Sequence, residues 1–397
     1  MNAHWQKLIG DAEQRSEFFL ATLITETGSP AIGSTPTPWG IPDPKPTMFQ
    51  AATAMACYHN PDSRLHRDPR IVAAYRLALD ISCRELNPDG TFDYPYCNFR
   101  SAPDTAFIIN RIFVTRELIA RSLPDPDLAP LLERIDALLE TTGRGIMSGG
   151  FHTPNHRWAC AAALSSCHQL TGKQEFRLAA ESYLIEGIDN NADGEYAERS
   201  AGNYNVVNND QMLILARTRE DASFLDPIEK NLEMMFCYID PDGSVFTGNS
   251  TRQDRGNRIW PEQYYFHDLN MARLRGRQDF AAMAERIMDR QIAAGQAAPD
   301  YLDLVMLHLG CVDYAVTPRG AQASSTAAKA TVAATVPDSY CRLFAESGIL
   351  RGRRGDFSYS LLKNNPVFLH FQSGSLQASL RLGVGFFERR DFIATEL

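Results

Sequence analysis

Apolar residues recur at helical spacing through about the first three quarters of the chain, and short loops separate most of the segments. This arrangement is typical of antiparallel helical hairpins. At 397 residues the chain is long enough for a large core and for two domains. The Pro- and Gly-rich segment 28–46 is predicted to lack regular helix. Helices are predicted at residues 5–27, 68–86, 105–122, 126–141, 155–171, 173–188, 208–219, 224–238, 262–274, 277–294 and 299–311.

An Asp-Gly dipeptide follows a predicted helix three times, at residues 89–90, 193–194 and 242–243. Each time a polar loop with aromatic residues comes next, and then another helix. Asp-Gly is good turn chemistry in itself, which is the simpler explanation for any one of them. Three occurrences at equivalent places favour a ring of helical hairpins with the long loops on one face. The sequence therefore predicts an (α/α) toroid with a cleft at one end.

The hydrophobic period changes towards the C-terminal end. Residues 316–337 are rich in Ala, Ser and Thr and are interpreted as a linker. Residues 338–397 show the alternation and the turn residues of short β-strands. Because a β-sandwich needs about 100 residues, we expect the start of an antiparallel β-sandwich that is incomplete or relies on packing against the helices. The predicted domains are thus a helical catalytic domain at 1–315, the linker, and a β-sheet domain at 338–397.

The composition restricts the partners and the location. The 39 Lys and Arg against 48 Asp and Glu give a net charge of −9, which argues against a nucleic-acid binder but permits an anionic substrate bound by a local Arg cluster. No apolar run is long enough for a membrane span. The N-terminal segment lacks the pattern of a signal peptide, so a cytoplasmic location is expected, or a secreted or periplasmic one if a leader has been removed. The eight scattered cysteines predict buried free thiols. The sequence does not define an oligomeric state.

Amide, imidazole, guanidinium and phenol groups are concentrated between Gly149 and Asp210. Asn155 and His156 stand at a predicted helix start, where an isolated pair most simply caps the helix and packs. Together with a phenol from the loop at 191–210, they form an acid/base set. Tyr204 is preferred to Tyr196 because it lies in a Gly- and Asn-containing loop without apolar periodicity. A phenol at its ordinary pKa of about 10 is a poor base, so a cationic neighbour is needed, and Arg157 or Arg199 could supply it.

A second group of polar residues is a candidate for binding an anionic substrate. Arg252, Arg255 and Arg258 lie in one polar loop and form either a solvated surface or a clamp for carboxylate or sulfate. Trp260, Tyr264 and Tyr265 follow, and they suit either sugar stacking or the core. Further candidates are Asn98, Arg100, Asp104 and Asn203.

Other catalytic classes have weaker signals. The chain has no dinucleotide fingerprint, phosphate-binding loop, GxSxG or HExxH, and its histidines lack the spacing of a zinc site. A pair of carboxylates for glycoside hydrolysis stays open as an alternative. The candidates are Asp93, Asp104, Asp193, Glu195 and Asp210.

With FHTPNHRW and DGEYAERSAGNYN in a helical part that precedes a β region, the chain resembles the heparinase II/III-type polysaccharide lyases. More broadly it is similar to the α/α-toroid lyases, which include enzymes for alginate, chondroitin and hyaluronate. The segment SGILRGRRGDFSYSLLKNNPVFLHFQSGS is similar to the start of that family's β-sandwich. The family's β-domain is normally longer than the one expected here.

The resemblance implies β-elimination on a uronate-containing polysaccharide or oligosaccharide. Asn155 matches the amide that neutralises the carboxylate, His156 the base or its helper, and Tyr204 the proton donor to the leaving oxygen. The resemblance implies no redox or nucleotide cofactor; some relatives carry a structural metal in the β-domain, for which no ligand set is evident here. Two alternatives remain at this point, a glycoside hydrolase on the same toroid and a glycan-binding protein without activity.

Overall fold

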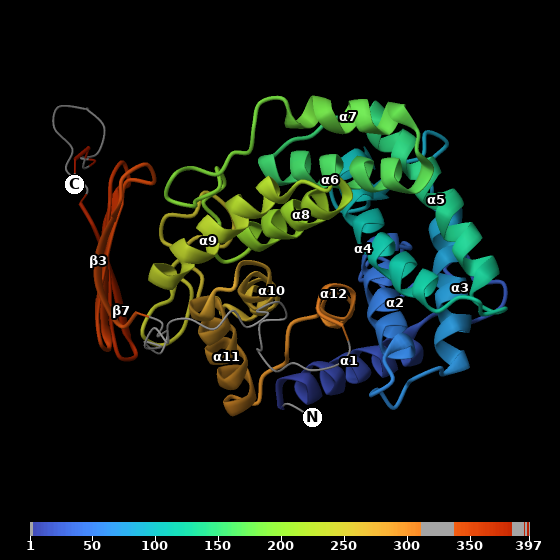
Figure 1. Ribbon diagram of the computed structural model, residues 1–397, viewed down its shortest axis with the longest axis horizontal. Coiled ribbons are helices and arrows are strands. Elements are labelled where there is room, and N and C mark those ends of the chain that lie inside the picture. Colours follow the sequence, from blue (N-terminus) through green and yellow to red (C-terminus); the bar gives the residue numbers. More distant parts are fainter. Residues whose placement is uncertain (1–2, 311–336, 383–392, 394, 397) are drawn as a thin grey trace, which may run out of the picture. The chain divides into compact units, whose positions relative to one another are not determined.

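The computed structural model describes all residues except 1–2, 311–336, 383–392, 394 and 397. The described part is mainly helical and ends in an antiparallel sheet, as predicted (Figure 1). Within it, no helix is both long and apolar enough to cross a bilayer. The helices are α1 (Ala3–Thr22), α2 (Pro44–His59), α3 (Pro69–Arg84), α4 (Ala102–Arg121), α5 (Ala129–Ser148), α6 (Pro154–Thr171), α7 (Gln174–Leu184), α8 (Tyr204–Thr218), α9 (Leu225–Tyr238), α10 (Tyr265–Arg275), α11 (Gln278–Ala293) and α12 (Leu302–His308).

The chain packs as two compact units. The first contains the described residues of Met1–Gly187, Ile214–Asp221 and Gln291–Val316. The second contains those of Ile188–Leu213, Ala222–Arg290 and Thr317–Leu397. The linker predicted at 316–337 lies outside the described residues apart from Pro337, so the domain bounds drawn from the sequence stay a prediction.

The first unit has two layers of helices. Helices α2, α4 and α6 pack against one another as an inner row, and α3, α5 and α7 contact them from outside. The inner helices are apolar nearly all round: α6 buries every residue from Trp158 to Cys167. The outer α7 buries only Phe176 and Ala180. This difference follows from the rule that a helix without a polar face must be covered on all sides.

Helix α2 corrects one sequence expectation. The Pro-rich segment was predicted to lack helix through residue 46, yet α2 starts at Pro44. Asp43 caps the helix by accepting from the Lys45 amide at 3.0 Å. Because the first turn of a helix needs no internal N–H donors, Pro44 and Pro46 fit there. The helix has almost no amphipathic pattern, since Ala, Met and Cys bury most of its surface.

The three Asp-Gly turns have the same backbone geometry. Amide–carbonyl hydrogen bonds join Asn87 with Thr91, Asn191 with Glu195 and Asp240 with Ser244 at 2.8–3.0 Å. The glycines Gly90, Gly194 and Gly243 have φ between 85° and 91°, a region that disfavours other residues. Each lies against a later helix: a Cβ would fall 2.5 Å from Thr141 O in α5, 2.2 Å from Lys230 O in α9, and 2.7 Å from the Arg290 guanidinium in α11. The repeat seen in the sequence is therefore a repeated packing unit.

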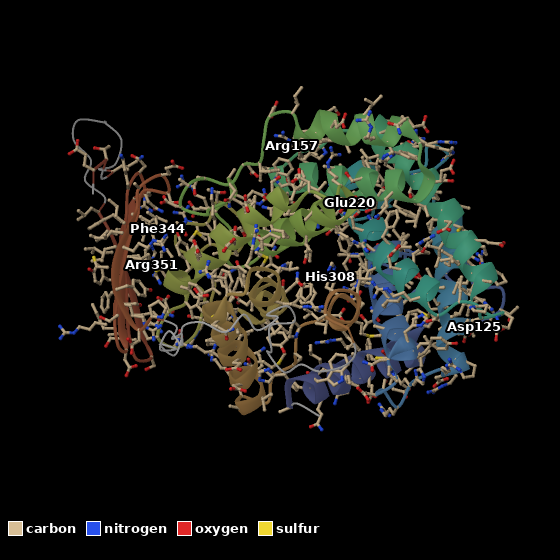
Figure 2. The ribbon with its side chains drawn as sticks, in the orientation of Figure 1. Asp125, Arg157, Glu220, His308, Phe344 and Arg351 are labelled. Atoms are coloured by element: carbon tan, nitrogen blue, oxygen red, sulfur yellow. The ribbon has the colours of Figure 1, made fainter. Side chains whose placement is uncertain are left out.

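A sheet of five antiparallel strands in sequential order completes the second unit. Phe344 packs its ring on Tyr238 of α9 at 5.6 Å, and buried Arg351 binds Asp240 at 2.9 Å. Phe344 and Arg351 are labelled in Figure 2. One face of the sheet is thus joined to residues of α9 and the loop after it, in line with the expectation that it relies on packing against the helices. Among the described residues after α12, these five strands form a single sheet. The strands are β3 (Ser339–Phe344), β4 (Ile349–Arg354), β5 (Phe357–Leu362), β6 (Val367–Ser373) and β7 (Leu376–Arg381).

A short hairpin, β1 (Phe92–Tyr94) and β2 (Asn98–Ser101), lies in the loop before α4 that was expected to be irregular. The seven described cysteines are all free, but Cys83, Cys97 and Cys341 are exposed, so the prediction of buried thiols is wrong for these three.

Candidate functional site

Asn155 and His156 lie in the first turn of α6, in the first unit. Thr153 precedes the helix with extended backbone, and Pro154 occupies the first helical position. Asn155 is fully buried and donates from Nδ2 to Thr153 Oγ1 at 3.0 Å. Because a helix N-terminus presents N–H groups and the positive end of the helix dipole, a carboxylate is favoured at this place.

His156 is half-buried among other rings. Its imidazole lies 6.0 Å from the Phe107 ring and 6.2 Å from that of His152, both edge to face. The Lys45 ammonium stands 5.0 Å from the centre of the Phe107 ring and forms an ion pair with Asp104 at 3.1 Å. A cation and an imidazole therefore share one aromatic side chain.

The row of rings continues away from His156. Lys45 also lies over Tyr94 at 5.2 Å, Tyr94 contacts Tyr96 at 5.0 Å, and Tyr96 meets Trp39 at 6.1 Å. Trp39 is 64% exposed and Tyr96 50%. Trp39 was not among the binding residues predicted from the sequence, because nothing local shows that it adjoins the hairpin.

The three predicted binding residues of the first unit each have a neighbour within the protein. Arg157 donates to Tyr183 O at 2.5 Å and pairs with Glu186 at 2.9 Å. Arg100 is exposed, has a φ of 49°, and lies 3.7 Å from Asp89. Asn98, half-buried, pairs with Tyr94 in the hairpin.

Tyr204 is the centre of the second unit's polar cluster. It is the first residue of α8 and not part of a loop, which corrects the sequence expectation. Its hydroxyl accepts from Gln253 Nε2 at 2.7 Å and from the Arg252 guanidinium at 3.4 Å. That guanidinium also stands 4.7 Å from the centre of the Tyr204 ring. The hydrogen bond with Tyr204 raises the pKa of Arg252, so the guanidinium stays protonated.

The cationic neighbour of Tyr204 is therefore Arg252. The sequence predicted Arg157 or Arg199 for this role. Arg199 pairs instead with buried Glu195 at 3.6 Å and has a φ of 52°. Burial raises the pKa of Glu195, which also accepts from Asn249 at 2.5 Å and from Tyr238 at 3.3 Å.

Hydrogen bonds to three side chains fix the loop before Tyr204. Asp254 accepts from the Gly202 amide at 3.0 Å, and Ser200 Oγ accepts from the Tyr204 amide at 3.1 Å. Tyr264 is almost fully buried and donates to Ala201 O at 2.6 Å, so it supports the loop from the core; its predicted contact with a substrate stays a prediction. Asn203, half-buried, lies in the same turn and donates its amide to Ser200 O at 3.2 Å.

The remaining residues of the Arg-rich loop have separate partners. Arg255 is exposed and donates to Asn365 in the turn before β6 at 3.0 Å. Arg258 pairs with Asp242 at 2.5 Å. The guanidiniums of Arg258 and Arg290 lie 5.0 and 3.7 Å from the centre of the Trp260 ring. Trp260 therefore stacks on arginines of its own unit, and the predicted stacking on a sugar would have to displace them.

The carboxylates considered for hydrolysis have structural partners in the described residues. Asp93 accepts from Asn87 and from the Arg100 amide. Asp193 accepts from the Glu346 and Ser347 amides. Asp210 lies 3.0 Å from buried His267. No three His, Cys, Asp or Glu side chains of the described part are grouped as metal ligands.

No protein-family model matches the chain, and no curated protein is significantly similar to it. Among solved structures, it is similar to a chondroitin AC lyase from Streptomyces coelicolor, with a TM-score of 0.57 and 15% identity over 92% of this chain and 51% of that one. A sugar epimerase from a ruminal bacterium gives a TM-score of 0.44 and 12% identity over 72% of this chain and 86% of that one.

The chain thus spans about half the length of the lyase. At this identity the likeness concerns the fold, and it supports the predicted (α/α)-toroid class with a C-terminal antiparallel sheet. The finer resemblance to heparinase II/III-type enzymes stays a prediction, as does the joint action of Asn155 and His156 in one unit with Tyr204 in the other.

Proposed function

We propose that this protein is a polysaccharide or oligosaccharide lyase that cleaves a uronic-acid-containing glycan by β-elimination. The observation that carries the proposal is the environment of Tyr204, whose hydroxyl oxygen receives one amide and one guanidinium donor. Two directed donors hold a phenol oxygen in a fixed position, which is what a tyrosine needs in order to transfer a proton to or from a bound substrate. The likeness in fold to a chondroitin AC lyase agrees with this chemistry.

In the proposed reaction, the proton on C5 of the uronate is removed and a carbanion forms beside the carboxylate. The electron pair then forms the C4–C5 double bond while the bond from C4 to the glycosidic oxygen breaks. That oxygen leaves with a proton. The difficult step is the first, because an ionised carboxylate stabilises the adjacent carbanion poorly.

Asn155 is the proposed partner of the carboxylate. A buried amide in the first turn of α6 combines a directed N–H donor with the positive end of a helix. Its position is set by Thr153, so little reorganisation accompanies charge development in the substrate.

His156 and Tyr204 are the proposed proton-transfer groups. Tyr204 is the proton donor to the leaving oxygen, and in a syn elimination it is also the base; His156 is the base or its helper. Arg252 keeps Tyr204 oriented and supplies charge, while buried Glu198 lies 3.5 Å from Arg252 Nε and balances it.

The row of rings from Trp39 to Tyr94, with Lys45 beside it, is the proposed contact for neighbouring sugars. Ring faces suit the apolar faces of sugars, and a lysine among them suits an anionic chain.

The test is ultraviolet absorbance during incubation with alginate, hyaluronan, chondroitin, heparan and glucuronan. A rising band from the conjugated 4,5-unsaturated uronate, lost in Tyr204→Phe and kept in Tyr58→Phe, is the expected result. New reducing ends without that band would replace the lyase by a hydrolase with paired carboxylates. Glycan binding with no product from any of these substrates would favour a non-catalytic binding protein.

A further inference from the structure

A pocket of about 130 Å³ lies between the sheet and the loop that follows α9, entirely within the second unit. Strands β4 to β7 form one wall and residues 244–248 and 256–258 the other. Since a cavity of roughly 10–15 Å³ holds one water molecule, this pocket has room for several waters or for one small ligand.

The charges around the pocket are already paired. Arg351 donates from Nε to Cys237 O at 2.9 Å, from one terminal nitrogen to Ser360 at 2.6 Å, and from the other to Asp240 at 2.9 Å. All three side-chain nitrogens of Arg351 therefore have hydrogen-bond partners, so the guanidinium needs no bound anion. At the rim, Arg258 is paired with Asp242. The pocket is polar but electrically balanced.

His370 on β6 provides an open hydrogen-bonding position. Its Nδ1 lies 2.7 Å from Ser379 Oγ, while its Nε2 is buried without a hydrogen-bond partner among the described residues. Burial lowers the pKa of His370, so the imidazole is neutral at pH 7. In one tautomer Nε2 donates and in the other it accepts, and in both a hydroxyl group would satisfy it.

Because residue 248 is a glycine, there is open space next to His370 Nε2. A Cβ at residue 248 would lie 2.8 Å from His370 Nε2 and 2.8 Å from the Phe246 ring. The Phe246 ring itself lies 5.5 Å from that of His370, and Phe371 also lines the pocket. Aromatic surface around a few directed polar groups is the usual composition of a site for a small polar molecule.

The pocket and Tyr204 share one loop. Thr247 Oγ1 donates to Asn257 O at 2.9 Å, and Asn257 Nδ2 donates to Gln253 O at 2.8 Å. Gln253 in turn donates to the Tyr204 hydroxyl. One part of the loop therefore lines the pocket and another binds the phenol, so a ligand in the pocket would contact the loop that orients the residue proposed to act on the uronate.

We propose that this pocket is a subsite for an uncharged sugar unit, with His370 Nε2 bonded to one of its hydroxyls and the rings around it packed on its apolar surface. That this unit neighbours the uronate in the same glycan rests on the proposed function; the binding of a neutral sugar does not.

The experiment is saturation-transfer NMR on the full chain with glucose, galactose, N-acetylglucosamine and N-acetylgalactosamine, and with glucuronate and sulfate as charged probes. We expect transfer to at least one neutral sugar. Gly248→Ala, which fills the space, and His370→Leu, which removes the hydrogen bond, should lower the affinity at least tenfold. His370→Gln retains a donor and an acceptor and should restore part of it.

Tyr204→Phe and Leu376→Ala are the controls. Tyr204→Phe should keep the sugar signal, and Leu376 is an exposed residue of β7 outside the pocket. Thermal unfolding of each variant separates loss of fold from loss of binding. No transfer to any neutral sugar, equal transfer in Gly248→Ala, or transfer to the charged probes alone would overturn the proposal. If a neutral sugar binds but the lyase assay is negative, the sugar subsite stands and the proposed lyase function is excluded.

Discussion

The two groups of residues that the proposed function combines, the Asn155 half in the first unit and the Tyr204 half in the second, are built in different ways. The backbone of Asn155 and His156 is set by their own neighbours in the chain, Thr153, Pro154 and the start of α6, although the His156 ring also contacts Phe107 of α4. Tyr204 is held across the sequence, by Arg252 and Gln253 at separations of 48 and 49 residues. The first half is a helix terminus, and the second is a network of half-buried and exposed polar groups, resting on buried Glu198 and Asp254, around a helix terminus.

The difference predicts which substitutions would disturb each half. A helix start depends on a few local residues and tolerates change elsewhere. A network of side chains from distant parts of the sequence depends on all its members, because removing one leaves another without a partner. We therefore expect remote substitutions to affect the Tyr204 half more than the Asn155 half, and the predictions below test this from the largest effect to the smallest.

Tyr204→Phe removes the hydroxyl and leaves the ring beneath Arg252. If Tyr204 transfers the proton, kcat should fall by about 10³-fold, within the range for general acid–base catalysis. KM should change little, since the ring is kept. Steady-state rates from the absorbance assay measure both. A kcat within threefold of the wild type would exclude a proton-transfer role.

Asn155→Ala removes the amide proposed to bind the carboxylate. The loss of one such donor typically costs about 10²- to 10³-fold in kcat. The local construction of this half predicts little further damage, so thermal unfolding should stay close to that of the wild type. A large drop in melting temperature with a small drop in kcat would assign Asn155 to stability instead.

Arg252→Ala and Arg255→Ala form a matched pair on one loop. Arg252 contacts Tyr204 and Glu198, so its removal should lower kcat roughly 10²-fold and leave Glu198 without this partner. Arg255 is exposed and binds Asn365, so its removal should mainly raise KM by a few-fold. Similar effects of the two substitutions would argue against a special role for Arg252.

Gly194→Ala tests the Asp-Gly turn that precedes the Tyr204 half. The new Cβ would meet Lys230 O and would require a φ near 91°, so unfolding should become easier by about 2 kcal/mol or more. Gly276→Ala is the control, because its φ of 67° is also positive but its Cβ meets open space; about 1 kcal/mol is expected. Urea unfolding gives both values. Equal effects would mean that close packing of the turn is unimportant.

Glu195 should give the second unit a small pH dependence. Because burial raises its pKa in the folded state, the folded chain holds this proton more tightly than the unfolded chain does. Its contribution to stability is then full at low pH and declines as the pH rises above its ordinary value of 4.5 towards the raised folded value. Glu195→Gln should flatten this part of the urea-unfolding profile. An unchanged slope would show that Glu195 is not the group responsible.

The sequence predicted the helices, the Asp-Gly repeat and the C-terminal strands because these depend on periodicity and turn chemistry, which neighbouring residues carry. It also identified Asn155, His156 and Tyr204 as candidates, since polar residues gathered in Gly- and Asn-rich segments are visible without a structure. Helix α2 was missed because an almost fully buried, Ala-rich helix has no amphipathic pattern.

Only the tertiary structure decided which groups meet. It paired Arg252 with Tyr204, turned Arg157 towards Glu186, put Tyr264 in the core, and set His370 beside Gly248. These contacts join residues far apart in the chain, and their energies depend on burial and distance. Local sequence fixes neither of these; it specifies the turns and helices that can form, and packing selects the side chains that share a site.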